Sequence, residues 1–163
     1  MPRSSCPCSK RNGEGTVLRT VQWLLRLALA ASFLSAVADR SGLWGPPGAP
    51  GVAWGAWPVF VAYVAQLNWF APTPLIPVLA WVATGLEVLL AIGLLVGWRL
   101  PWVALGSGCL LLAFASTMTL ALGIKAPLDF SVFTAAASAF LLALVAAGER
   151  TGKEATTHGM TCP

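Results

Sequence analysis

Glu87 is the residue of this sequence that its surroundings explain least. It lies in the apolar run ATGLEVLLAIGLLVG, residues 83–97, and is the one charged residue there. A carboxylate in such a run can exchange a proton, accept a hydrogen bond from a ligand or neutralise a buried cation. Each role needs a partner or water nearby, because an unpaired charge at the centre of a bilayer costs about 2.5–3.5 kcal/mol or more.

Arg26 is the predicted partner of Glu87. It interrupts the first apolar run of the chain, residues 20–38. At about 1.5 Å per helical residue, Arg26 lies roughly 10 Å above Arg19, and Glu87 roughly 18 Å above Arg99 at the same membrane surface. The remaining gap of about 8 Å is within reach of two long side chains, which favours an intramembrane Arg26–Glu87 ion pair. The alternative is that Arg26 extends to the headgroups and Glu87 stays protonated.

Four further charged residues form a predicted outer polar cluster. Asp39, Arg40, Lys125 and Asp129 fall in connections expected at the membrane surface opposite Arg19 and Arg99. Their charges sum to zero, which favours salt bridges that tie these connections together. The alternative is a polar mouth that admits a substrate or partner.

No metal or haem site is predicted. Cys6, Cys8 and Cys162, with His158, have the right side chains for a soft metal, but their spacing matches no standard zinc pattern and predicts reduced thiols. A single histidine excludes bis-histidine haem ligation. The sequence also has no phosphate-binding loop and no serine–histidine–aspartate set, so no complete catalytic constellation predicts an enzyme.

The composition indicates a membrane protein. Hydrophobic residues make up 57% of the chain and charged residues only 10%, whereas a soluble domain carries about 25% charged residues. The mean hydropathy is +0.76, and eight tryptophans favour membrane–water interfaces. The net charge of +4 does not indicate a nucleic-acid partner, because the basic residues gather at the ends of apolar runs. The lipid bilayer is the predicted partner.

The apolar pattern predicts an all-α integral membrane protein, a bundle of four transmembrane helices at residues 20–38, 75–97, 101–123 and 130–147. Residues 57–71 are apolar but too few to span, which predicts a short interfacial helix between the first two spans. The transmembrane domain therefore covers residues 20–147. Polar residues 1–19 and 148–163 are predicted as flexible tails.

The basic residues predict the orientation, because Lys and Arg favour the cytoplasmic side. With both termini inside, seven basic residues face the cytoplasm and two, Arg40 and Lys125, face outside; the seven are Arg3, Lys10, Arg11, Arg19, Arg99, Arg150 and Lys153. The prediction is a protein of the cytoplasmic (cell inner) membrane. A competing interpretation is a signal peptide cleaved after the Ala36-Val37-Ala38 sequence, which would remove the first span.

Three segments resemble the DoxX family of four-span membrane proteins, over residues 17–147. LLRLALAASFL (24–34) is similar to the family's first span with its arginine, Arg26, and LEVLLAIGLLVGWRLPWVAL (86–105) to its second-span signature with Glu87, Gly93, Gly97 and Arg99. FVAYVAQLNWFAP (60–72) is similar to the segment that precedes that span. One departure is AVADRSG (36–42), where the family often has Gly-x-x-Lys; Arg40 is the charge available there.

The resemblance implies a redox-associated membrane subunit. The first hypothesis is an accessory or anchoring subunit of a membrane redox complex, with other redox proteins as partners. The second is an oxidoreductase subunit that binds a quinone, with Glu87 hydrogen-bonded to a quinone oxygen. The third is a small proton-coupled transporter in which Glu87 takes up the proton.

Overall fold

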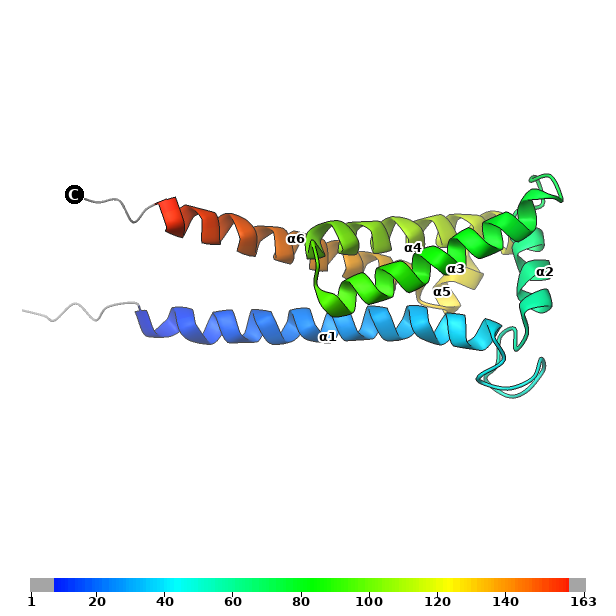
Figure 1. Ribbon diagram of the computed structural model, residues 1–163, viewed down its shortest axis with the longest axis horizontal. Helices are drawn as coiled ribbons and strands as arrows, with labels where there is room; N and C mark the ends of the chain where they lie inside the picture. The colour runs from blue at the N-terminus through cyan, green and yellow to red at the C-terminus, as the bar shows by residue number, and fades with distance from the viewer. Residues whose placement is uncertain (1–7, 159–163) are drawn as a thin grey trace, which may run out of the picture.

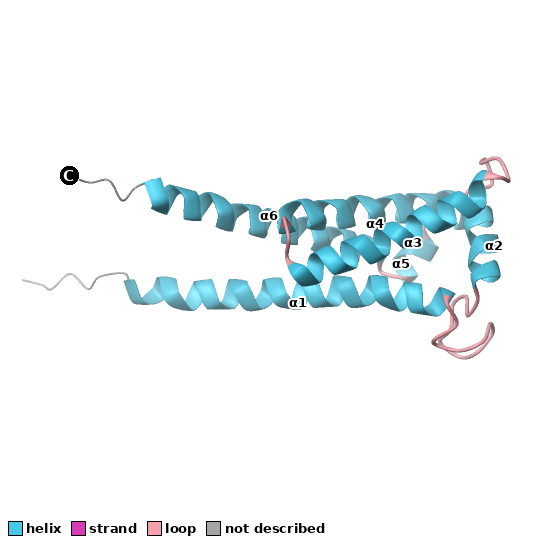
Figure 2. Cartoon of the chain, viewed as in Figure 1, coloured by secondary structure: helices cyan, strands magenta, loops and turns pink. Residues whose placement is uncertain are grey.

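The computed structural model describes residues 8–158, and these form helices and loops without a strand (Figure 2). The helices are α1 (Cys8–Arg40), α2 (Trp57–Leu67), α3 (Leu75–Val96), α4 (Leu100–Leu122), α5 (Lys125–Asp129) and α6 (Val132–His158). Four segments are long and apolar enough to cross a membrane: Thr16–Arg40, Leu75–Val96, Leu100–Leu122 and Val132–Glu149. The predicted four-helix membrane bundle with a short helix between its first two spans is therefore confirmed.

The four long helices lie roughly side by side, and α2 stands across one end of them (Figure 1). Contacts are most extensive between α4 and α6 and between α1 and α3. The start of α1 and the end of α6 extend from the end of the bundle opposite α2 (Figure 1). An even number of spans brings the two described chain ends to the same side.

Two apolar clusters hold the helices together. The larger joins all four spans and consists of Leu29, Ala30, Phe33, Ala91, Leu94, Leu100, Ala104, Ala139, Leu142, Ala143 and Ala146. The smaller packs α2 onto the start of α3 through Phe60, Val64, Ile76 and Ala80. More than half of the larger cluster is alanine, which lets helix backbones approach closely where no hydrophobic effect drives association.

Glycine makes the closest helix contacts. A Cβ atom on Gly108 of α4 would lie 2.7 Å from the ring of Phe140 in α6, so this contact requires glycine. A Cβ on Gly93 of α3 would lie 3.0 Å from Val103 of α4. The turn between α3 and α4 is tight, with Gly97 and Arg99 both at positive φ (78° and 44°) and Pro101 in the first turn of α4.

The helix ends differ from the prediction in three places. Helix α1 already begins at Cys8 and α6 continues to His158, so residues 8–19 and 148–158 are helical where flexible tails were predicted. A helix that a span has nucleated extends at little cost, which explains both extensions. Helix α2 ends at Leu67 instead of residue 71, because the Asn68 side chain donates to the Val64 carbonyl and Pro72 follows.

Candidate functional site: an arginine–glutamate pair beside a cavity

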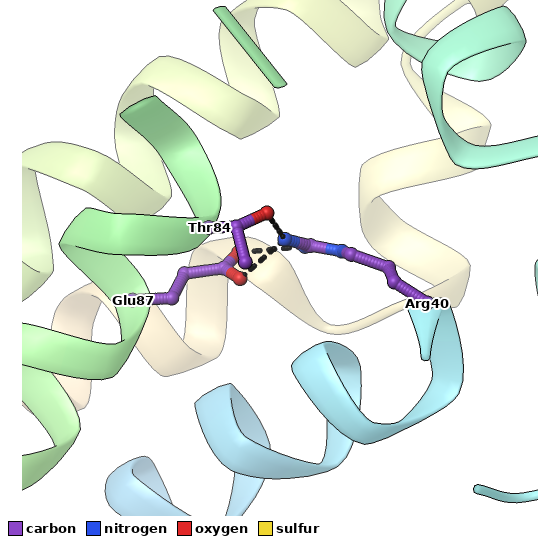
Figure 3. Close-up of polar contacts among 3 residues, drawn as sticks. All are labelled: Arg40, Thr84 and Glu87. Atoms are coloured by element: carbon purple, nitrogen blue, oxygen red, sulfur yellow. Dashed lines mark hydrogen bonds and ion pairs between the residues drawn. The ribbon is translucent and has the colours of Figure 1, made fainter. Parts of the chain in front are cut away.

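Glu87 is buried in the middle of α3 and is paired with Arg40 from the last turn of α1 (Figure 3). Arg40 Nη2 donates to Glu87 Oε1 at 2.8 Å, and Nη1 lies 2.7 Å from Oε2. Nη1 also donates to the Thr84 hydroxyl at 2.7 Å, one turn before Glu87. Both charged side chains are nearly inaccessible, with 4% and 2% of the residue surface exposed for Arg40 and Glu87. The pair is therefore a desolvated, two-pronged contact that joins α1 to α3.

Aromatic rings cover the Arg40 guanidinium. Its central carbon lies 3.9 Å from the centre of the Phe60 ring and 5.2 Å from that of Trp54. The two rings also contact each other edge to face, at 5.2 Å between centroids. A cation over an aromatic face gains roughly 2 kcal/mol when desolvated. Helix α2 and the loop before it thus help to hold the arginine in place.

The predicted Arg26–Glu87 pair is wrong, because Arg26 binds elsewhere. Its Nε and Nη2 donate to the carbonyls of Leu94 and Leu95, at 2.7 and 2.9 Å. Both carbonyls belong to the last turn of α3, where no backbone N–H is available to them. The cation also meets the negative end of the α3 dipole. Arg26 therefore caps α3 from a neighbouring helix.

Gly97 provides the space for this cap. It follows α3 in the left-handed conformation, and a Cβ atom there would lie 2.7 Å from Arg26 Nη2. The Trp23 ring covers the guanidinium from the other side, with its centre 3.9 Å from the central carbon. Glycine at residue 97 thus serves both the turn and the arginine.

Asp39, next to Arg40, organises the loop before α2. Its carboxylate accepts hydrogen bonds from the backbone N–H groups of Ala53, Trp54 and Gly55, at 2.8, 3.3 and 3.1 Å. Gly55 has φ +66°, and a Cβ there would collide with the backbone of Pro47 at 2.5 Å. Because Trp54 is one of the three residues held, Asp39 fixes the ring that covers Arg40.

The four predicted outer charges do not form one cluster. Asp39 and Arg40 are buried and bind the loop and α3, as described above. Lys125 and Asp129 are exposed and pair with each other within α5. Helix α5 contacts α4 and α6 but, among the described elements, not α1. The single outer cluster is corrected to two separate sets, because Glu87 and the loop N–H groups supply nearer partners for Arg40 and Asp39.

The ion pair borders a half-open cavity of about 540 Å³. Its walls come from α1, α2, α3, α4 and α6, and most of them are apolar. One stripe of α3 (Leu79, Val82, Ala83, Leu86 and Glu87) and one stripe of α4 (Leu110, Leu111, Phe114, Thr117 and Met118) line it. Apolar cavities of roughly 300–1,000 Å³ with a few polar groups are typical of small-molecule sites.

Sequence reasoning missed the residues around the pair. Thr84 was detectable, because a hydroxyl three residues before Glu87 shares its helix face. The interfacial helix predicted over residues 57–71 gave no reason to place Phe60 and Tyr63 beside Glu87, yet both of them, with Trp54, line the cavity. Their role depends on how α2 docks onto α3, which hydropathy does not reveal.

Among the described residues, no group of three or more His, Cys, Asp or Glu side chains could hold a metal ion. Cys6 and Cys162 lie outside the described residues. Comparison of the chain with protein-family models, curated proteins and solved structures finds no match in any of the three.

Proposed function

We propose that this protein is an accessory or anchoring subunit of a membrane-associated redox complex, similar to the DoxX family, in the cytoplasmic membrane. The observation that carries the proposal is the use of the buried charges. Arg26, Arg40 and Glu87 are bound within the chain, and each contact joins α1 to α3. Charges used in this way stabilise a scaffold.

The placement of the residues that resemble the DoxX pattern supports the family assignment. Arg26, from the first-span segment, caps the helix that carries the second-span segment, next to its Gly97. Gly93 of the same segment packs against α4. The residues that make the resemblance thus contact each other or neighbouring helices, as expected for a shared architecture.

The proposed orientation has both termini in the cytoplasm. Its support is the bias of seven basic residues against two, together with the common side of the two described chain ends (Figure 1). The cavity and α2 then lie in the outer half of the membrane. Helix α6 extends past its membrane-spanning segment on the cytoplasmic side, where it is available to partner proteins.

The test of the subunit role is purification of the full-length protein from native membranes in a mild detergent. We expect a flavin- or haem-containing protein to co-purify, seen by absorption spectrum and mass spectrometry. A matched preparation of Arg40→Ala, which loosens the α1–α3 contact, should recover less of it. Recovery of this chain with lipid alone would contradict the proposal.

A second candidate is a quinone-interacting subunit, and the cavity is the observation that favours it. Its apolar walls suit an isoprenoid chain, and its polar groups suit a ring oxygen. Because the described residues hold no metal site, electrons would come from a cofactor of another subunit. Organic extraction of the purified protein should then yield about one quinone per chain.

A further inference from the structure

A second hollow lies next to the cavity beside the ion pair. This hollow of about 450 Å³ lies against α2 and is lined by Ala53, Val59, Ala62, Gln66 and Leu122, together with three aromatic residues. Those three, Trp54, Tyr63 and Phe130, also line the larger cavity. The rings of Trp54 and Tyr63 lie 5.7 Å apart. The two hollows therefore share three aromatic side chains in their linings.

The ion pair itself has little to offer a ligand. Arg40 Nη1 and Nη2 and Glu87 Oε1 already make hydrogen bonds. Arg40 Nε makes none, and the contact of Glu87 Oε2 with Arg40 Nη1 at 2.7 Å is an ion pair without a hydrogen bond, but both atoms are fully enclosed by protein. A ligand would have to break the pair to bind to it, which would leave a buried charge without its partner.

Tyr63 lines the cavity, and the single polar hydrogen of its side chain remains free to donate. Within the described structure its hydroxyl makes no hydrogen bond and, unlike the two enclosed atoms, is not sealed from its surroundings. Burial raises the pKa of Tyr63, so the hydroxyl stays protonated. The hydroxyls of Ser32 and Thr117 and the side-chain amide of Asn68 also line the cavity, but they donate to the carbonyls of Ala28, Phe114 and Val64, respectively.

The charge of the cavity limits its ligand to a neutral molecule. Arg40 and Glu87 cancel each other, and no other charged residue lines the walls. A charged ligand would therefore be desolvated without a counter-charge. A free phenol donor in an apolar cavity is instead complementary to a neutral acceptor such as a carbonyl oxygen.

We propose that the cavity binds a neutral amphiphile whose head carries a carbonyl group, with the carbonyl oxygen accepting a hydrogen bond from Tyr63. Its chain lies along the lining stripes of α3 and α4. Leu79, Val82 and Leu86 in the α3 stripe are partly exposed, so the ligand enters sideways from the bilayer. For a quinone ligand, the inference rests on the quinone-binding candidate above. It differs in that Tyr63, rather than Glu87, makes the hydrogen bond to the ligand.

Two sources could supply this chemistry, a quinone and an ester lipid. The experiment reconstitutes the full-length protein in nanodiscs of ether-linked phosphatidylcholine, which has no ester carbonyl, and measures equilibrium binding of a radiolabelled short-chain benzoquinone and of dioctanoylglycerol. An alkane of similar length serves as the probe without a carbonyl. The variant is Tyr63→Phe, which removes only the hydroxyl, and the matched control is Thr117→Val, which removes a hydroxyl already bound within its own helix.

We expect saturable binding of at least one carbonyl probe, weakened about 3- to 10-fold in Tyr63→Phe and less than 2-fold in Thr117→Val. Alkane binding should be the same in all three proteins. Equal affinity of wild type and Tyr63→Phe, or no saturable binding of either carbonyl probe, would overturn the proposal. Binding of dioctanoylglycerol but not benzoquinone would support the site and remove the quinone candidate. Co-purification of a redox protein depends on neither result, so the subunit role is tested separately.

Discussion

The buried charges of this protein are stabilised in three different ways. Arg40 faces a carboxylate, Arg26 faces helix-end carbonyls, and Asp39 faces backbone N–H groups. In each case the partner is a group that can form hydrogen bonds but has no backbone neighbour to bond with: a carboxylate, a helix-end carbonyl or a loop N–H. Removing one partner should therefore cost more than the contact contributes, because the other partner is left desolvated.

Arg40→Ala should destabilise the protein by about 3–5 kcal/mol, because Glu87 then remains buried without a cation. The measurement is the free energy of unfolding in detergent micelles. The double variant Arg40→Met with Glu87→Leu should lie close to wild type or above it, since no unpaired charge is left. Arg19→Ala is the control: Arg19 is exposed in the same helix, and its loss should change stability by less than about 0.5 kcal/mol. An Arg40→Ala protein as stable as Arg19→Ala would contradict the Arg40–Glu87 pair.

Gly97→Ala should destabilise the turn between α3 and α4 and displace Arg26. The left-handed backbone alone costs a residue with a side chain about 1–2 kcal/mol, and the new Cβ would meet the guanidinium. Gly85→Ala, within α3, is the control, since no atom lies within 4 Å of its Cβ position. Thermal unfolding of the two variants should separate them clearly. Equal melting temperatures would contradict both the backbone cost at residue 97 and the close approach of Arg26 to it.

The sequence alone singles out Glu87 but does not predict which arginine pairs with it. An acid within an apolar run identifies itself by composition. Its partner depends on how far α1 is shifted along α3, and the prediction assumed that Arg19 and Arg99 lie at equal heights. In the structure Arg26 is level with Leu94, which lies seven residues past Glu87 in α3. Arg40, 14 residues after Arg26 in α1, is therefore the arginine that reaches Glu87.

At the scale of elements, α3 connects α1, α2 and α4. It contacts α1 through the two arginines, α2 through an apolar cluster and a tilted Trp57–Trp81 ring contact at 4.3 Å, and α4 through Gly93. The number and bounds of the spans followed from hydropathy and length, because a bilayer imposes both. The pairing of helices did not, since small residues occur on several faces of each span.

The α4–α6 contact provides a test at this scale. Gly108→Ala places a methyl group 2.7 Å from the Phe140 ring, and such overpacking costs about 1–3 kcal/mol. Gly106→Ala in the same helix reaches only an ordinary contact distance, 3.4 Å from Leu90, and should be near neutral. Urea or SDS titrations of both variants measure the difference. A Gly108→Ala protein as stable as Gly106→Ala would indicate that α6 shifts freely on α4.

At the scale of the whole molecule, the exposed tryptophans mark two levels. Trp23, Trp98 and Trp102 belong to the end where the chain enters and leaves the bundle, and Trp44, Trp69 and Trp81 to the end covered by α2. Tryptophan favours the membrane–water interface. The two groups therefore agree with a bundle that crosses one bilayer from end to end.

Thiol labelling tests the proposed orientation of this bundle. With the four native cysteines replaced, a cysteine introduced at Pro50, in the loop before α2, should react with a membrane-impermeant maleimide in intact cells. A cysteine at Glu149, past the end of the fourth span, should react only after permeabilisation. Both positions are exposed. The reverse pattern would invert the topology and place the cavity in the cytoplasmic half.

The Arg40–Glu87 pair also has a consequence for biogenesis. Its two residues are 47 positions apart in the chain, so during synthesis the arginine leaves the ribosome well before the acid that neutralises it. Until α3 arrives, α1 presents a lone cation at its trailing end, which favours staying at the membrane surface. The pair thus favours α1 and α3 reaching their final depth together, whereas the loop held by Asp39 lies wholly before α3 in the chain.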